Sequence, residues 1–144
     1  RCDIKSVSLL ANVLLRQLSC DAGAAETLLL RDGLLMEAST SSALVVRGGT
    51  VLTPPDSRQI LPGTTRPVVE ELLAQLRIPL QTRPITETEL RSADELWLSS
   101  AIREISAVTR LDGVVVGSGK PGPLWHRVRA AFDTLKARVA QEPW

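Results

Sequence analysis

Residues 26–53 read ETLLLRDGLLMEASTSSALVVRGGTVLT, and this stretch decides the class of fold. Asp32-Gly33 and Arg47-Gly48-Gly49 are turn sequences typical of β-hairpins, because glycine and aspartate tolerate the backbone angles of tight turns. The apolar runs around them predict strands over residues 26–30, 34–38, 43–46 and 50–52. Hairpins in succession argue against a regular βαβ series.

Three longer segments outside this stretch predict the main helices. The first covers residues 7–22, where apolar side chains recur at helical spacing, and Gly23 follows at the usual helix end. The second starts near Gly63, with Glu70 and Glu71 expected to favour its N-terminal dipole. The third runs from Pro123 to about residue 140. Helices mixed with hairpins predict an α+β (mixed α/β) fold.

The remaining elements are shorter. Thr86-Glu87-Thr88-Glu89 matches a capping box and predicts a short helix over residues 87–92. Further strands are predicted over residues 78–83, 95–99 and 105–111, and Asp112-Gly113 marks another hairpin. Gly117-Ser118-Gly119-Lys120 predicts a turn and not a phosphate loop, because Pro121 stands where a hydroxyl residue is required.

Composition excludes several classes of function. The 144 residues carry a formal net charge of +1, so nothing favours nucleic acid or an anionic membrane as partner. Apolar residues make up 44% of the chain, which suits one domain with a buried core, and no apolar run is long enough to span a bilayer. Cys2 and Cys20 lack metal-ligand spacing and predict reduced thiols in a cytoplasmic protein, with no metal. His126, the only histidine, is expected to be a solvated helix residue.

Four separated features are candidates for one site. Lys5 lies in a segment that looks like the end of a strand, and Glu37 lies in a turn of small and hydroxyl residues. Gly63-Thr64-Thr65 opens a helix, where N–H groups and the dipole favour an anion, and Ser99-Ser100 ends an apolar strand. Each alone has a commoner explanation, such as a solvated lysine, a polar turn or a simple cap.

Together these features suit pyridoxal phosphate. That cofactor needs a lysine amine for a Schiff base, an acid beside the pyridine nitrogen and a cradle for its phosphate. The chain offers one of each, in this order along the sequence.

The chain resembles the class IV pyridoxal-phosphate aminotransferases, and within them the D-amino acid transaminase branch. The resemblance extends from Arg1 to about Arg129. It rests on Arg1-Cys2-Asp3-Ile4-Lys5-Ser6, Asn12-Val13-Leu14, Asp32-Gly33 with the Glu37 turn, Ile60-Leu61-Pro62-Gly63-Thr64-Thr65-Arg66, Ala93-Asp94-Glu95-Leu96, and Asp112-Gly113 followed by Gly119-Lys120-Pro121-Gly122.

The resemblance implies a role for each candidate residue. Lys5 matches the catalytic Schiff-base lysine, which also moves the proton between substrate and cofactor. Glu37 matches the partner of the pyridine nitrogen. Thr64 and Thr65 match the phosphate-binding helix start, and Ser100-Ala101 matches the second phosphate loop.

The resemblance also implies a domain and an activity. Residues 1–144 match the C-terminal large domain of the two-domain fold, and the N-terminal domain that precedes the lysine is absent from this chain. The implied activity is transfer of an amino group from a D-amino acid or related donor to a 2-oxo acid, in a homodimer. A lyase of the aminodeoxychorismate type and a non-catalytic relative are the alternatives. The chain alone is expected to be inactive, with an apolar inter-domain face prone to association.

The chain departs from the family pattern at several positions. In the turn after Glu37, the departures are Ala38, Ser42 and Leu44 in place of a glycine, an asparagine and an aromatic residue. Ala101 replaces a threonine and removes one phosphate hydroxyl. Arg103 is a large cation where a small polar residue is common, so it either compensates for lost phosphate contacts or faces solvent.

Overall fold

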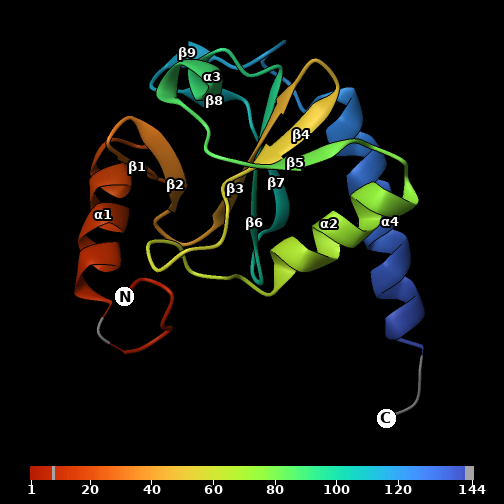
Figure 1. Ribbon diagram of the computed structural model, residues 1–144, viewed down its shortest axis with the longest axis horizontal. Helices are drawn as coiled ribbons and strands as arrows, with labels where there is room; N and C mark the ends of the chain where they lie inside the picture. Colours follow the sequence, from red (N-terminus) through yellow and green to blue (C-terminus); the bar gives the residue numbers. More distant parts are fainter. Residues whose placement is uncertain (8, 142–144) are drawn as a thin grey trace.

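The computed structural model describes residues 1–7 and 9–141. Figure 1 shows the elements, which in chain order are α1 (Leu10–Asp21), β1 (Leu28–Arg31), β2 (Leu34–Ala38), β3 (Ser42–Arg47), β4 (Thr50–Thr53), α2 (Thr65–Gln75), β5 (Leu80–Thr82), α3 (Glu87–Arg91), β6 (Glu95–Ser100), β7 (Glu104–Val108), β8 (Arg110–Leu111), β9 (Val114–Val115) and α4 (Pro123–Val139). The predicted α+β class is confirmed, and α1, α2 and α4 are the long helices expected from the sequence.

Within the described residues, the main sheet has the strand order β5-β4-β3-β6-β7. Neighbouring strands in this sheet run antiparallel, except that β4 and β5 run parallel. The β1–β2 and β8–β9 hairpins form small sheets of their own, and at their turns Asp32 and Asp112 have φ of 52° and 49°. The strand predicted over residues 105–111 is divided, because β7 pairs with β6 whereas β8 pairs with β9.

Both faces of the main sheet are buried, which explains the continuous apolar runs of its central strands. On one face, Leu44 and Trp97 pack with α2 and α4. On the other face, Val45 and Leu98 pack with Leu35 of β2 and with α3. Figure 1 shows α2 and α4 to the right of the sheet, and α1 with the β1–β2 hairpin to its left. The sheet is therefore the central layer of the domain.

Helix α1 carries an exposed apolar face. Leu10, Leu14 and Leu18 are 70%, 57% and 61% exposed. Polar contacts hold the helix instead: Asn12 Nδ2 donates to Ser39 O at 2.9 Å, and Thr27 Oγ1 donates to the carbonyl of Leu15 at 2.8 Å. The helix is therefore fastened to the β1–β2 hairpin by hydrogen bonds, while its apolar side stays open.

Glu95 connects the start of β6 to the start of α4. Its buried carboxylate accepts hydrogen bonds of 2.9 Å from Leu124 N, Trp125 N and Trp97 Nε1. The carboxylate thus satisfies two N–H groups that a helix leaves unpaired at its N-terminus. A Cβ at Gly122 would lie 2.1 Å from the Glu95 carboxyl carbon, so this approach requires glycine.

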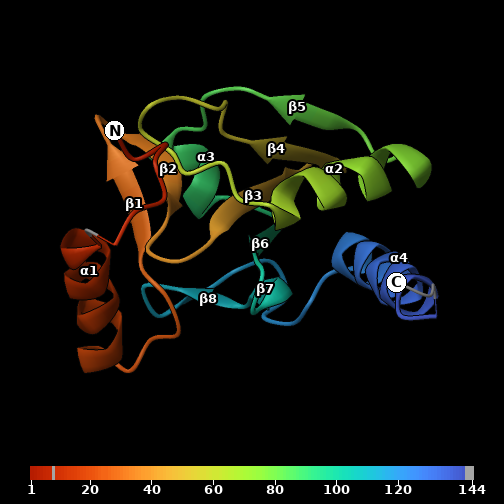
Figure 2. The same ribbon diagram turned by 90° about the horizontal axis from the view of Figure 1, so that it is seen from below.

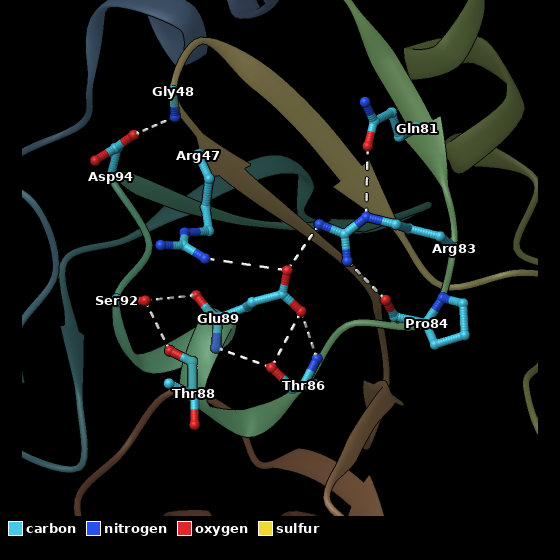
Figure 3. A network of polar contacts seen from close by, with 10 residues as sticks. All are labelled: Arg47, Gly48, Gln81, Arg83, Pro84, Thr86, Thr88, Glu89, Ser92 and Asp94. Atoms are coloured by element: carbon cyan, nitrogen blue, oxygen red, sulfur yellow. Dashed lines mark hydrogen bonds and ion pairs between the residues drawn. The ribbon is translucent and has the colours of Figure 1, made fainter.

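The predicted capping box at the start of α3 is confirmed, and it belongs to a wider polar network (Figure 3). Glu89 accepts hydrogen bonds from Thr86 N at 2.9 Å and from Arg83 Nη2 at 2.7 Å. Arg47 lies 4.0 Å from the same carboxylate. The hydrogen bond from Arg83 and that from Thr86 lower the pKa of Glu89 to about 2. The network joins the β3–β4 hairpin to the segment between β5 and α3.

Other expectations concern single residues or long segments. His126 is exposed on α4, with its ring edge-on to Trp125. Gly117–Lys120 forms a turn before α4 and not a helix start. Cys2 and Cys20 are free and exposed. In residues 1–7 and 9–141, every helix is too short or too polar to cross a membrane.

Candidate active site

Glu37 lies near the end of β2 and is 9% exposed. Its Oε2 accepts a hydrogen bond of 3.0 Å from the backbone N–H of Leu61, in the loop before α2. Burial raises the pKa of Glu37, and the hydrogen bond from Leu61 offsets part of that rise. The structure therefore brings the predicted acid against the segment that leads into the predicted phosphate-binding helix.

The start of α2 differs from a simple capped helix. Thr64 is the N-cap residue, yet its side chain makes no capping hydrogen bond, and its backbone is already helical. Thr64 is exposed and Thr65 is buried. The first N–H groups of a helix lack partners within it, so this end favours an anion.

The expectation that Glu70 and Glu71 favour the N-terminal dipole of α2 was wrong. The helix begins at Thr65, which places Glu70 and Glu71 beyond its first turn. Glu70 instead pairs with the buried Arg66, whose Nε lies 2.8 Å away, and Arg66 also contacts Asp56 at 3.0 Å. No acidic side chain of that turn therefore competes with an anion there.

Small and hydroxyl residues lie where α2 approaches the main sheet. Ser42 of β3 is the register partner of Ser99 of β6. A Cβ at Gly63 would lie 3.1 Å from Ser42 Oγ, so glycine keeps this approach open. Ser99 is 2% exposed, and within the described residues its Oγ has no hydrogen-bond partner. Buried hydroxyls normally find partners, so Ser99 Oγ is an exception to that rule at this end of the sheet.

Ser100 is the last residue of β6, and Ala101 begins the exposed turn that follows. Ser100 Oγ accepts a hydrogen bond of 3.1 Å from the backbone N–H of Arg103. The Arg103 side chain donates to the carbonyl of Ala25 at 2.7 Å. Arg103 was expected either to compensate for lost phosphate contacts or to face solvent. Neither alternative describes it fully, because its side chain binds the segment before β1.

Lys5 lies in the segment before α1, and it is exposed. The expected strand end at this position was wrong, because residues 1–7 form turns and bends. The segment contacts the loop before α2, where Cys2 N donates to Arg58 O at 2.9 Å (Figure 2). Lys5 and Glu37 therefore both come from segments that meet residues 58–61.

Glu26 is the residue near the candidate site that sequence reasoning missed. The turn after Glu37 consists of small and hydroxyl residues, which were expected to let a ligand approach. Instead, Glu26 accepts hydrogen bonds from the side chains of Ser39, Thr40 and Ser41. Burial alone would raise the pKa of Glu26, but hydrogen bonds from Ser39, Thr40 and the Thr27 N–H, together with the charge of Arg103, lower it. No local sequence signal marks this contact, because Glu26 belongs to the preceding strand region.

The chain is similar in fold to solved structures of aminotransferases. The chain superposes on the Escherichia coli branched-chain amino acid aminotransferase with a TM-score of 0.85 and 30% identity, covering 88% of this chain and 42% of that one. A second branched-chain amino acid aminotransferase, solved with pyridoxamine 5'-phosphate, gives a TM-score of 0.85 and 29% identity over 94% of this chain and 44% of that one.

The family model for amino-transferase class IV matches residues 1–111, and the chain belongs to this family. It is 40% identical over 133 residues to the D-alanine aminotransferase of Bacillus licheniformis, covering 92% of this chain and 47% of the relative. Against the D-alanine aminotransferase of Listeria innocua serovar 6a, identity is 38% over 142 residues, covering 99% and 49%. The resemblance predicted from the sequence is confirmed, and the chain spans about half the length of these curated relatives.

Proposed function

We propose that this chain is the C-terminal domain of a pyridoxal-phosphate-dependent aminotransferase that acts on D-amino acids or related amino donors and on 2-oxo acids. The observation that carries the proposal is the bond between Glu37 and Leu61, because it holds the acid against the loop that leads into α2, whose N-terminus we assign to the phosphate. The relatives named D-alanine aminotransferase support the donor class. Their greater length supports a further domain, placed before Lys5 as in the family fold.

The residues present fit the cofactor. The start of α2, where no side chain makes a capping hydrogen bond, suits a phosphate group, which binds favourably at helix N-termini. Glu37 is buried enough for its charge to be costly, and a cationic neighbour such as a protonated pyridine nitrogen would favour its ionised form. A relative solved with pyridoxamine 5'-phosphate supports the same assignment.

When bound, pyridoxal phosphate supplies an aldehyde and an electron sink. In this proposal Lys5 holds the cofactor covalently and moves the proton at the substrate Cα. Glu37 keeps a proton on the pyridine nitrogen. Thr64 and Thr65 hold the phosphate through the N–H groups at the start of α2, and Ser100 supports it from the β6 end. Ala101 supplies only its backbone, since it has no hydroxyl.

We also propose a homodimer, as in the family, and a cytoplasmic location, which the free thiols of Cys2 and Cys20 favour. The amino-acid and 2-oxo-acid substrates are small molecules. We expect the domain alone to lack turnover, because the first domain would supply the remaining walls of the site.

Covalent trapping tests the proposal. The protein is incubated with pyridoxal phosphate, reduced with borohydride and mapped by peptide mass spectrometry. We expect the added mass on Lys5 and its loss in Lys5→Ala. Because Lys5 is exposed, that change should alter the free energy of unfolding by no more than about 0.5 kcal/mol. Lys120→Ala, another exposed lysine, is the control that should keep the label on Lys5. Label spread evenly over both lysines would contradict the proposal.

A second assay separates the aminotransferase from the aminodeoxychorismate-type lyase. The full-length enzyme is given a D-amino acid with a 2-oxo acid, or aminodeoxychorismate alone. We expect the D-amino acid to be converted to its 2-oxo acid in the first assay, and no pyruvate to be released from aminodeoxychorismate in the second. The relatives named aminotransferase favour this outcome over the lyase.

A further inference from the structure

The two sides of the proposed cofactor site belong to different sheets. Glu37, assigned to the pyridine nitrogen, lies on β2 of the small β1–β2 sheet. Ser100, assigned to the phosphate, lies on β6 of the main sheet. A rigid ligand that touches both sides requires a fixed distance between them. Contacts that fasten one sheet to the other therefore matter for binding.

Arg103 makes such a contact. Its Nη2 donates to the carbonyl of Ala25 at 2.7 Å, across 78 residues of sequence. Its backbone N–H donates to Ser100 Oγ at 3.1 Å. Arg103 therefore fastens the end of β6 to the segment immediately before β1.

Glu26 continues this connection to the turn after Glu37. It follows Ala25 in the chain, and its carboxylate accepts hydrogen bonds from successive hydroxyls of that turn, those of Ser39, Thr40 and Ser41. Thr27 N donates to the same carboxylate at 3.0 Å. Hydrogen bonds to an ionised acceptor are among the stronger ones in proteins, and the positive charge of Arg103 favours that ionised form.

We propose that Arg103 and Glu26 are positioning residues that set the distance between the phosphate side of the site and Glu37. The assignment of one side to the phosphate and the other to the pyridine nitrogen rests on the proposed function. The connection between the two sheets rests only on the hydrogen bonds of Arg103 and Glu26. Arg103 acts through Ala25 and Ser100, and not as a ligand of the phosphate.

Amide hydrogen exchange on the cofactor-free chain tests the connection. The reporter is Leu61 N–H, which is bonded to Glu37, and the reference is Leu98 N–H in the centre of β6. In Arg103→Met and in Glu26→Gln we expect Leu61 to exchange about tenfold faster, with Leu98 unchanged. Arg103→Lys keeps a donor and should restore part of the protection. Glu71→Gln, an exposed carboxylate on α2, should change neither rate.

Ligand binding tests the role in the site. In Arg103→Met, we expect the affinity for pyridoxal phosphate to fall about tenfold, because that ligand touches both sides. The affinity for inorganic phosphate, which touches one side, should stay unchanged. An equal loss for inorganic phosphate would make Arg103 a phosphate ligand and overturn the proposal.

Two further outcomes are decisive. If Leu61 and Leu98 accelerate equally, the two residues serve general stability, and the proposal fails. If the unaltered protein binds neither pyridoxal phosphate nor inorganic phosphate, the proposed function fails. The connection itself is rejected if the exchange rate of Leu61 N–H is unchanged in both Arg103→Met and Glu26→Gln.

Discussion

The Glu37 carboxylate and the Leu61 backbone N–H are 3.0 Å apart, and this bond joins β2 to the loop before α2. It is the contact through which two predicted parts of the site, far apart in the sequence, meet in the fold. Burial raises the pKa of Glu37 above the ordinary value of 4.5, and the bond from Leu61 offsets part of that rise.

That raised pKa gives a prediction for Glu37→Gln in the cofactor-free chain. A raised folded pKa means that the folded state binds the proton more tightly, so the associated stability is full below pH 4.5 and is lost as pH rises through the folded pKa. The neutral glutamine avoids this loss. We expect a higher Tm than the parent at pH 7 and no difference in acid, measured by thermal melts across pH. A lower Tm than the parent at pH 7 would contradict the raised pKa of Glu37. Glu37→Gln should also weaken the binding of pyridoxal phosphate.

Glu89 should show the opposite dependence on pH. Hydrogen bonds from Arg83 and Thr86 lower its pKa from 4.5 to about 2. A lowered folded pKa contributes stability above pH 4.5, and this contribution is lost as pH falls through about 2. We expect Glu89→Gln to lower the Tm at pH 7 and to leave it nearly unchanged near pH 2. Glu71→Gln serves as the exposed control and should give parallel melts at both values.

Gly122→Ala and Gly63→Ala should differ sharply in their effect on stability. The new Cβ at residue 122 would lie 2.1 Å from the Glu95 carboxyl carbon and would displace it from its donors. Leaving buried N–H groups unpaired should cost about 3 kcal/mol in the free energy of unfolding. At Gly63 the nearest atom is Ser42 Oγ at 3.1 Å, a side chain that can rotate, so we expect a cost of about 1 kcal/mol. Urea titrations measure both, and equal costs would be inconsistent with the close approach of Glu95.

The apolar face of α1 should drive self-association of the isolated chain. Leu14 and Leu18 are 57% and 61% exposed, so replacing both with Gln should leave the Tm nearly unchanged. We expect the doubly substituted chain to sediment as a monomer at concentrations where the parent associates. Val114→Gln, on a hairpin and 66% exposed, is the matched control. If this control reduced association as much as the double change, the face responsible would not be α1.

Much of the fold could be predicted because its signals are local. Asp32-Gly33 and Asp112-Gly113 both form hairpin turns, since their positive φ angles suit those residues. The capping box at Thr86 forms because its partners lie within one helical turn. The burial of β3 and β6 followed from their apolar runs. Element ends were less accurate: α1 begins at Leu10 rather than at residue 7.

The contacts around the site could not be predicted in the same way. Arg103 and Ala25 are 78 residues apart, and their bond uses a backbone carbonyl that every residue possesses. The sequence shows that Glu26 and the hydroxyl turn are polar, but it does not show that one binds the other. The carboxylate of Glu95 likewise reaches N–H groups of a helix that begins far along the chain. Such pairings depend on how the elements pack.

Strands β3 and β6 carry different residues at the two ends of their pair. Ser42 faces Ser99 at one end of the pair, and Val46 faces Glu95 at the other. Glu95 and the Glu89 network (Figure 3) hold the fold at the end remote from the serines, whereas Arg103 and Glu26 hold it at the serine end. The contacts at the Glu95 end therefore do not depend on the residues around the candidate site. A departure from the family pattern such as Ala101 can therefore change the candidate site while the Glu95 end of the domain keeps its contacts.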